Sequence, residues 1–215
     1  MKITTGRLEA FSDGVIAIII TIMILELKLP DLNRHSSEAH MISYLKSLAP
    51  YFSIYVFSYT MIGIFWTNHH HMFHLLETTD ETLLWLNFVF LFALSLIPFA
   101  TAIVGASPLL SLSAAIYGFV LLLTTLSFLV MRNYTIRHKL LHEDNDRTLS
   151  RKIYRLSLRA RTKSLVGAIV YLAAIGTAYI NIYVAYIGFL IPAVIFFLPE
   201  GIDGERLSEI VAEEK

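Results

Sequence analysis

Residues 82–131 contain no Asp, Glu, Lys or Arg, and this long charge-free run restricts the folds open to the chain. At about 1.5 Å per helical residue, one helix of this length would far exceed the hydrocarbon core of a bilayer, which is about 30 Å thick. The run must therefore fold back once. The break is predicted at residues 105–108, Gly-Ala-Ser-Pro, because Gly ends helices and Pro cannot continue them. Two membrane-spanning helices are expected, at about residues 82–104 and 109–131.

The composition extends this interpretation to the whole chain. Hydrophobic residues make up 56% of the sequence and charged residues 16%, whereas soluble domains carry about 25% charged residues. A second charge-free run, residues 164–199, is divided at Asn181 into two short spans, 164–180 and 182–199. Further apolar spans are expected at residues 8–29 and 48–70. We predict an all-α polytopic membrane protein in which residues 1–215 form one domain of six transmembrane helices.

The basic residues predict the orientation of these helices. Ten of the seventeen Lys and Arg residues lie within residues 132–163, whereas the segment between the second and third spans contains none. Basic loops stay on the cytoplasmic side, which places the 132–163 loop and both termini in the cytoplasm. We expect the loop to be solvated, in part as a helical extension, and contact with anionic lipid headgroups is the alternative.

Asp13 stands at the start of the first span, directly before the apolar residues 14–25. A charged side chain at the bilayer centre costs about 3 kcal/mol on insertion scales, so Asp13 needs partners or water. Arg7 is six residues away on the same helix, and the two side chains point apart. Polar residues at the same depth are supplied by the second and third spans: Trp66, Asn68, His69, His70 and Asn87. We expect Arg7, a histidine and an amide to hold Asp13 and to fix the first helix.

One stripe of the first helix carries apolar residues three or four positions apart. Its members are Ile18, Ile22 and Leu25, and the stripe extends backward to Val15 or Gly14 and to Phe11. Ser12, Asp13 and Thr21 are expected partly off this face. Residues that line a pore must share such a stripe, which could face copies of itself around a symmetry axis. Packing against lipid or another helix is the alternative that periodicity leaves open.

The histidines at the end of the second span raise the question of a metal or haem site. His70 and His74 are four apart on one helix face, as zinc ligands can be, and Asp13 could complete a set. The sequence lacks the interposed Glu of a zinc peptidase, and spans three to six contain no histidine for a haem. Neither a phosphate-binding glycine loop nor a Ser-His-Asp arrangement is evident. We therefore predict no metal site, no cofactor, no enzymatic activity and no nucleic-acid partner.

The residues Arg7-Leu8-Glu9-Ala10-Phe11-Ser12-Asp13 contain the pattern Arg-x-x-x-Phe-Ser-Asp. This pattern resembles the signature of the prokaryotic relatives of the endosomal and lysosomal potassium channel. The resemblance continues through residues 66–70, Trp-Thr-Asn-His-His, and through Leu86-Asn87 and Ile97-Pro98-Phe99. It covers about the first half of the chain, and beyond Gly105 only the pattern of spans agrees.

The resemblance implies a leak-type potassium channel in the plasma membrane of a prokaryote. The chain has no Thr-Val-Gly-Tyr-Gly loop, and in this family the first helix lines the pore in place of a carbonyl filter. Counting from the signature Asp implies a hydrophobic constriction at Ile18, Ile22 and Leu25. Because animal relatives carry two six-span repeats per chain, a homotetramer around the first helix is expected here.

Polar residues along the same helix are the expected contacts of the permeant ion. Thr21 lies between two layers of the constriction and is the polar candidate of the pore. Glu26 and Asp31, at the outer mouth, are expected to attract potassium and other monovalent cations. Two other functions stay open: a proton-coupled transporter that uses Asp13 with His69 or His70, and an assembly protein without transport.

Overall fold

The computed structural model describes residues 4–27, 37–142 and 147–197. These residues form seven α-helices and one short 3-10 helix, as the all-helical prediction requires. The elements are α1 (Thr5–Ile22), η1 (Met23–Glu26), α2 (Glu38–His74), α3 (Glu81–Ser95), α4 (Ile97–Ala106), α5 (Ser111–Arg137), α6 (Arg147–Thr177) and α7 (Ile182–Phe197).

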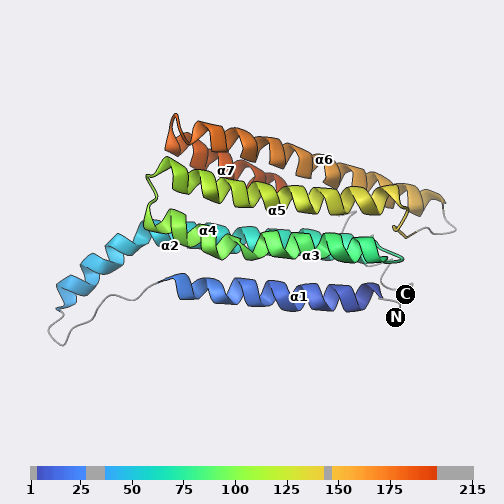
Figure 1. The fold of residues 1–215 in the computed structure, drawn as a ribbon, viewed down its shortest axis with the longest axis horizontal. Helices are drawn as coiled ribbons and strands as arrows, with labels where there is room; N and C mark the ends of the chain where they lie inside the picture. The colour runs from blue at the N-terminus through green and yellow to red at the C-terminus, as the bar shows by residue number, and fades with distance from the viewer. Residues whose placement is uncertain (1–3, 28–36, 143–146, 198–215) are drawn as a thin grey trace.

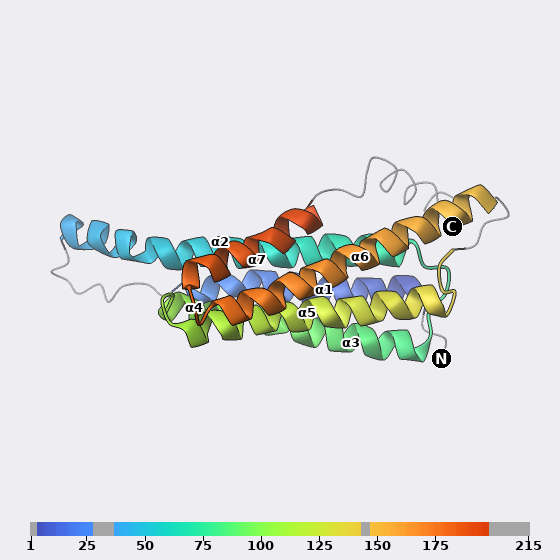
Figure 2. The ribbon, with the colours of Figure 1, turned by 90° about the horizontal axis from the view of Figure 1, so that it is seen from above.

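The helices run back and forth along one long axis and form three layers (Figure 1). The first layer is α1, the middle layer contains α2, α3 and α4, and the third contains α5, α6 and α7. Accordingly, α1 packs against α2 and α3, while α5 packs against α3, α4 and α6. Figure 2 shows α6 crossing α5 obliquely and the start of α2 projecting beyond the other helices. The first helix is therefore an outer layer of the bundle.

The predicted turns coincide with the helix boundaries. The charge-free run 82–131 folds back between Ala106 and Ser111, at the Gly-Ala-Ser-Pro segment. Asn181 begins α7 by accepting hydrogen bonds at Oδ1 from the backbone amides of Tyr183, at 3.0 Å, and Val184, at 3.4 Å. Such an N-terminal cap satisfies amides that have no partner inside the helix.

The expected third span, 82–104, is divided into two helices by an interruption at Leu96. Pro98 lies at the start of α4 and has no amide hydrogen to donate to the preceding turn. Together α3 and α4 still extend over Glu81–Ala106 as one apolar stretch.

Two helices are longer than the expected spans. The second expected span began at residue 48, but α2 begins at Glu38, where the Ser37 side chain accepts from the His40 amide. Similarly, α6 begins at Arg147, so about half of the expected basic loop belongs to this helix. Lys and Arg are good helix formers, and a helix can continue from the hydrocarbon core into water. Among the described residues, four helical stretches are long and apolar enough to cross a membrane: Thr5–Glu26, Glu38–His74, Glu81–Ala106 and Ser111–Arg137. The apolar α7 is shorter, with 16 residues.

The third layer is held together by close helix packing. A Cβ atom added to Gly188 of α7 would lie 2.8 Å from the Cβ of Ala174 on α6. Glycine at this position lets the two backbones approach, as small residues do between membrane helices. The third layer contacts α3 through α5, and α3 in turn contacts α1.

Candidate pore face and polar contacts of the first helix

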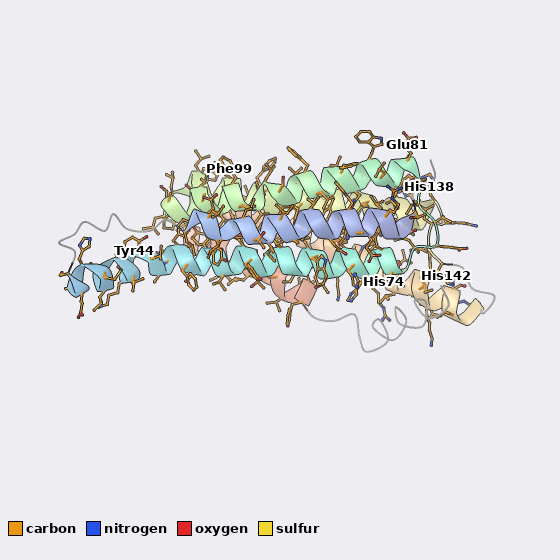
Figure 3. All side chains as sticks on the ribbon, turned by 90° about the horizontal axis from the view of Figure 1, so that it is seen from below. Tyr44, His74, Glu81, Phe99, His138 and His142 are labelled. Carbon is orange, nitrogen blue, oxygen red and sulfur yellow. The ribbon has the colours of Figure 1, made fainter. Side chains whose placement is uncertain are left out.

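The first helix has one buried face that fixes it to the bundle. Leu8, Ile16 and Ile19 are buried, as is Met23 in η1, and the fully buried Ser12 lies among them. These residues recur every three or four positions, so they form one stripe, and α1 packs on α2 and α3. Figure 3 shows α1 lying in front of these two helices, with its other side facing the viewer.

The residues of the predicted constriction are exposed, Ile18 and Ile22 on α1 and Leu25 on η1. Ile18 is 62% exposed, Ile22 43% and Leu25 76%. Phe11 and Gly14 are also exposed, whereas Val15 is half-buried, so the stripe passes through Gly14. The predicted apolar stripe is thus largely exposed within the part of the chain that the structure describes.

Thr21, which the periodicity predicts to lie partly off this stripe, is exposed as well. Its hydroxyl donates to the backbone carbonyls of Ala17, at 2.8 Å, and Ile18, at 2.9 Å. The hydroxyl proton of Thr21 is therefore donated within the helix, and the hydroxyl oxygen keeps lone pairs that can face a cation.

A buried hydrogen-bond chain joins α1 to α2 and α3. Asn87 of α3 donates from Nδ2 to the Ser12 hydroxyl, at 2.8 Å, and its Oδ1 lies 2.9 Å from Nε2 of His69 on α2. Ser12 in turn donates to the Leu8 carbonyl at 2.9 Å. All three side chains are fully buried, so the bonds offset the cost of placing polar groups between apolar helices. The imidazole of His69 also stacks between the rings of Phe73 and Phe90.

Asp13 has a different partner from the one expected. The Trp66 indole donates from Nε1 to Asp13 Oδ1 at 2.8 Å, while the histidine and the amide of the expected set bond through Ser12 instead. Arg7 is exposed, and no ion pair joins it to Asp13 within the described part of the chain. Successive helical residues point about 100° apart, so Ser12 and Asp13 face different neighbours.

The remaining signature residues occupy separate positions. Phe11 contacts Phe88 of α3 edge to face, with ring centroids 5.4 Å apart. Asn68 donates to the carbonyl of Ile64, one turn earlier on its own helix, at 2.8 Å, so this bond does not link helices.

One contact of the first helix was missed by sequence reasoning. Glu9 of α1 lies 3.1 Å from Nδ1 of His70 and 3.6 Å from Nε2 of His74, both on α2. In the sequence, the only sign of this contact is that Glu9 stands one turn before Asp13. Asp13 was the carboxylate expected near these histidines. At the other end of α1, Glu26 is half-buried in η1. Asp31, the second expected acid of that mouth, lies outside the described residues.

The chain is similar to known proteins of one family. The family model described as "Endosomal/lysosomal potassium channel TMEM175" matches residues 7–98. A potassium channel of Chryseobacterium sp. (strain P1-3) is 36% identical over 92% of this chain and 94% of its own length. The crystal structure of a lysosomal potassium-selective channel TMEM175 homologue from Chamaesiphon minutus superposes with a TM-score of 0.75, at 27% identity, over 92% of this chain and 98% of that one.

A longer animal relative matches only a part of the chain. The Bos taurus protein named endosomal/lysosomal proton channel TMEM175 is 34% identical over 34% of this chain and 17% of its own length. The two bacterial relatives, in contrast, match almost end to end. Residues 7–98, which the family model matches, include α2, α3 and all of α1 except its first two residues. The chain belongs to the TMEM175 family, a family of ion channels and not of enzymes.

Proposed function

We propose that four copies of this chain form a leak-type potassium channel whose pore is lined by α1. The observation that carries the proposal is the exposed apolar stripe formed by Ile18 and Ile22 on α1 and continued by Leu25 on η1. Bacterial relatives named potassium channels support the choice of ion. A single α1 cannot enclose a path, whereas identical copies around an axis can.

Features of this face favour contact with other copies over contact with lipid. Other helices also expose apolar side chains, which is ordinary for a lipid-facing surface. The face of α1, however, includes Gly14, where an added Cβ would meet nothing within 4 Å of its own chain. Glycine is thus not required there by the single subunit, and small residues are the ones that allow membrane helices to approach closely. The exposed Arg7 at the end of the same face also requires water or polar partners.

In the proposed channel, Ile18, Ile22 and Leu25 narrow the path and Thr21 supplies an oxygen to a partly dehydrated ion. A hydrophobic constriction conducts only when it widens or wets, so polar substitutions there should increase flux. Glu26 and Asp31 would raise the local cation concentration at one mouth.

The distribution of charge supports a six-span topology with both termini in the cytoplasm. The end of α5 and the first part of α6 carry most of the Lys and Arg residues of the described chain. They lie at the same end of the bundle as the start of α1, and His74, His138 and His142 are seen there in Figure 3. By the positive-inside rule this end faces the cytoplasm, which in a prokaryote is the inner side of the plasma membrane.

Cross-linking tests the assembly directly. The chain has no cysteine, so Ile18→Cys introduces the sole thiol. Oxidation in native membranes should give covalent dimers on a non-reducing gel, because copies of this residue face one axis. The matched control is Ile169→Cys on α6, which is 60% exposed and lies in the third layer, away from α1. Absent dimers for Ile18→Cys, or equal yields for both variants, would contradict a pore lined by α1.

Ion flux from proteoliposomes tests the conduction. Wild-type protein should release potassium passively, and Ile18→Asn should release it faster with a weaker preference over sodium, because the amide lowers the cost of wetting the constriction. The control Ile169→Asn makes the same substitution on a different surface and should leave flux unchanged. Equal effects of the two substitutions on flux would show that Ile18 does not line the ion path.

A proton pathway is the second candidate, because the Bos taurus relative is named a proton channel. Asp13, Glu9 and the histidines of α2 lie near one end of α1, as such a pathway would need. The described bonds, however, pair Asp13 with Trp66 and His69 with Asn87, so they do not link Asp13 to a histidine. The same liposomes with an internal pH dye separate the two functions. Potassium efflux without a proton gradient supports the channel, whereas flux that requires the gradient and disappears in Asp13→Asn supports the transporter.

A further inference from the structure

Glu9, His70 and His74 bring three metal-binding atoms together at the junction of α1 and α2. His70 and His74 are separated by one helical turn, and their rings lie 4.2 Å apart, nearly perpendicular to one another. Glu9 comes from the other helix, and its Oε1 lies 3.1 Å from His70 Nδ1 and 3.6 Å from His74 Nε2. All three atoms are within 4.8 Å of one another. The three side chains are half-buried, so an ion could reach them from water.

The two distances from Glu9 are those expected between ligands of a small transition-metal ion. Zinc binds imidazole nitrogen and carboxylate oxygen at about 2.0–2.2 Å, so two ligands of a tetrahedral site lie about 3.4 Å apart. The two distances from Glu9, 3.1 and 3.6 Å, fall on either side of this value. A fourth position would remain open to water, since three ligands come from the chain.

A second observation concerns hydrogen bonding. Glu9 Oε1 and His70 Nδ1 are buried, and neither atom makes a hydrogen bond within the described part of the chain, although they are close together. Buried polar atoms normally have a partner, and an unsatisfied one calls for an explanation such as an ion. A cation between the two atoms would satisfy both of them.

We propose that Glu9, His70 and His74 bind a first-row transition-metal ion of the zinc type, which joins α1 to α2. Two nitrogen ligands and one carboxylate favour such an ion over Mg²⁺ or Ca²⁺, which prefer oxygen ligands. From the sequence we predicted no metal site, and the ligand set considered there paired the histidines with Asp13. In the structure Glu9 takes the place of Asp13. Asp13 lies one turn further along α1 and is bonded to Trp66. The proposal does not depend on ion conduction, because it concerns only the folded chain.

Cobalt(II) is the probe, since it replaces zinc in such sites and absorbs visible light strongly when its coordination is tetrahedral. The purified full-length protein, with any affinity tag removed and metals stripped by a chelator, is titrated in detergent micelles. We expect absorption bands that saturate at one cobalt per chain and disappear on addition of Zn²⁺. Zn²⁺ should also raise the midpoint of thermal unfolding, because it links two helices.

Conservative variants test the assignment of the ligands. Loss of a residue that only hydrogen-bonds to a metal ligand typically weakens metal binding about 10- to 100-fold. Glu9→Gln and His74→Gln change the ligands themselves, so each should weaken cobalt binding by at least this factor. The control His71→Gln changes an exposed histidine on the same helix and should bind as the wild type does. The titration of wild-type protein decides the matter even if a variant fails to fold. No tetrahedral bands in the wild type, or bands of unchanged affinity in Glu9→Gln, would overturn the proposal.

Discussion

Replacing Asn87 by Leu should destabilise the chain more than any other single polar substitution near α1. Asn87 is fully buried and connects Ser12 to His69 through bonds of 2.8 and 2.9 Å. Leu is similar in size, so the change removes the bonds without a large cavity. Ser12 keeps its bond to the Leu8 carbonyl, so the main loss concerns His69.

The expected loss in the free energy of unfolding depends on the hydrogen bonds that His69 keeps after the substitution. Its Nδ1 already has no hydrogen-bond partner in the described structure, so Asn87→Leu leaves both ring nitrogens unsatisfied. A buried polar group without a partner costs about 1–3 kcal/mol, and a side-chain bond between membrane helices is worth about 0.6 kcal/mol. We expect a loss of about 2–3 kcal/mol in the free energy of unfolding. For a chain of this length this corresponds to about 4–12 °C in the unfolding midpoint.

Thermal unfolding of purified protein in detergent, followed by circular dichroism, measures this shift. The matched control is Asn68→Leu, because Asn68 bonds only to the Ile64 carbonyl of its own helix. The control should lower the midpoint by much less, since no buried partner is abandoned. Equal midpoints for the two variants would refute the reasoning that the chain from Ser12 to His69 holds α1 in place.

The same assay checks two further predictions. Trp66→Phe removes the 2.8 Å bond to Asp13 and should cost about 1–2 kcal/mol. Trp85→Phe makes the same change where no described bond to Asp13 is lost and should cost little, so similar losses would argue against the bond. Gly188→Ala should destabilise by about 1–3 kcal/mol, because its methyl group would lie 2.8 Å from a methyl group of α6. Gly176→Ala has open space and should stabilise by up to about 1 kcal/mol, so the two alanine variants must shift the midpoint in opposite directions.

The fold was predictable where the physics is local. Hydropathy located the helices, and the residues that end or begin helices located the turns at 105–108 and at Asn181. The lengths of α2 and α6 were not predictable in the same way. A hydropathy pattern reports where the chain leaves the hydrocarbon core, and not whether a helix continues beyond it. The break at Leu96 was missed because Pro98 lies inside a run whose apolar character does not change.

The candidate pore face was predictable for a related reason. A helix repeats its faces every 3.6 residues, so the spacing of Ile18, Ile22 and Leu25 was sufficient to place them on one side. Their exposure, in contrast, depends on which side of α1 the other helices cover, and sequence periodicity leaves that choice open. The packing of Leu8, Ser12 and Ile19 onto α2 and α3 made this choice.

By itself, the sequence determined the class of protein, the places where the chain crosses from apolar to polar surroundings, and the stripe along the first helix. Only the tertiary structure decided the pairing of the polar groups: Asp13 with Trp66, Ser12 with Asn87, and Glu9 with His70 and His74. Hydropathy and periodicity arise from neighbours along the chain. The partner of a side chain depends on how each helix is rotated and shifted against the next, and one residue along a helix turns a side chain by about 100°.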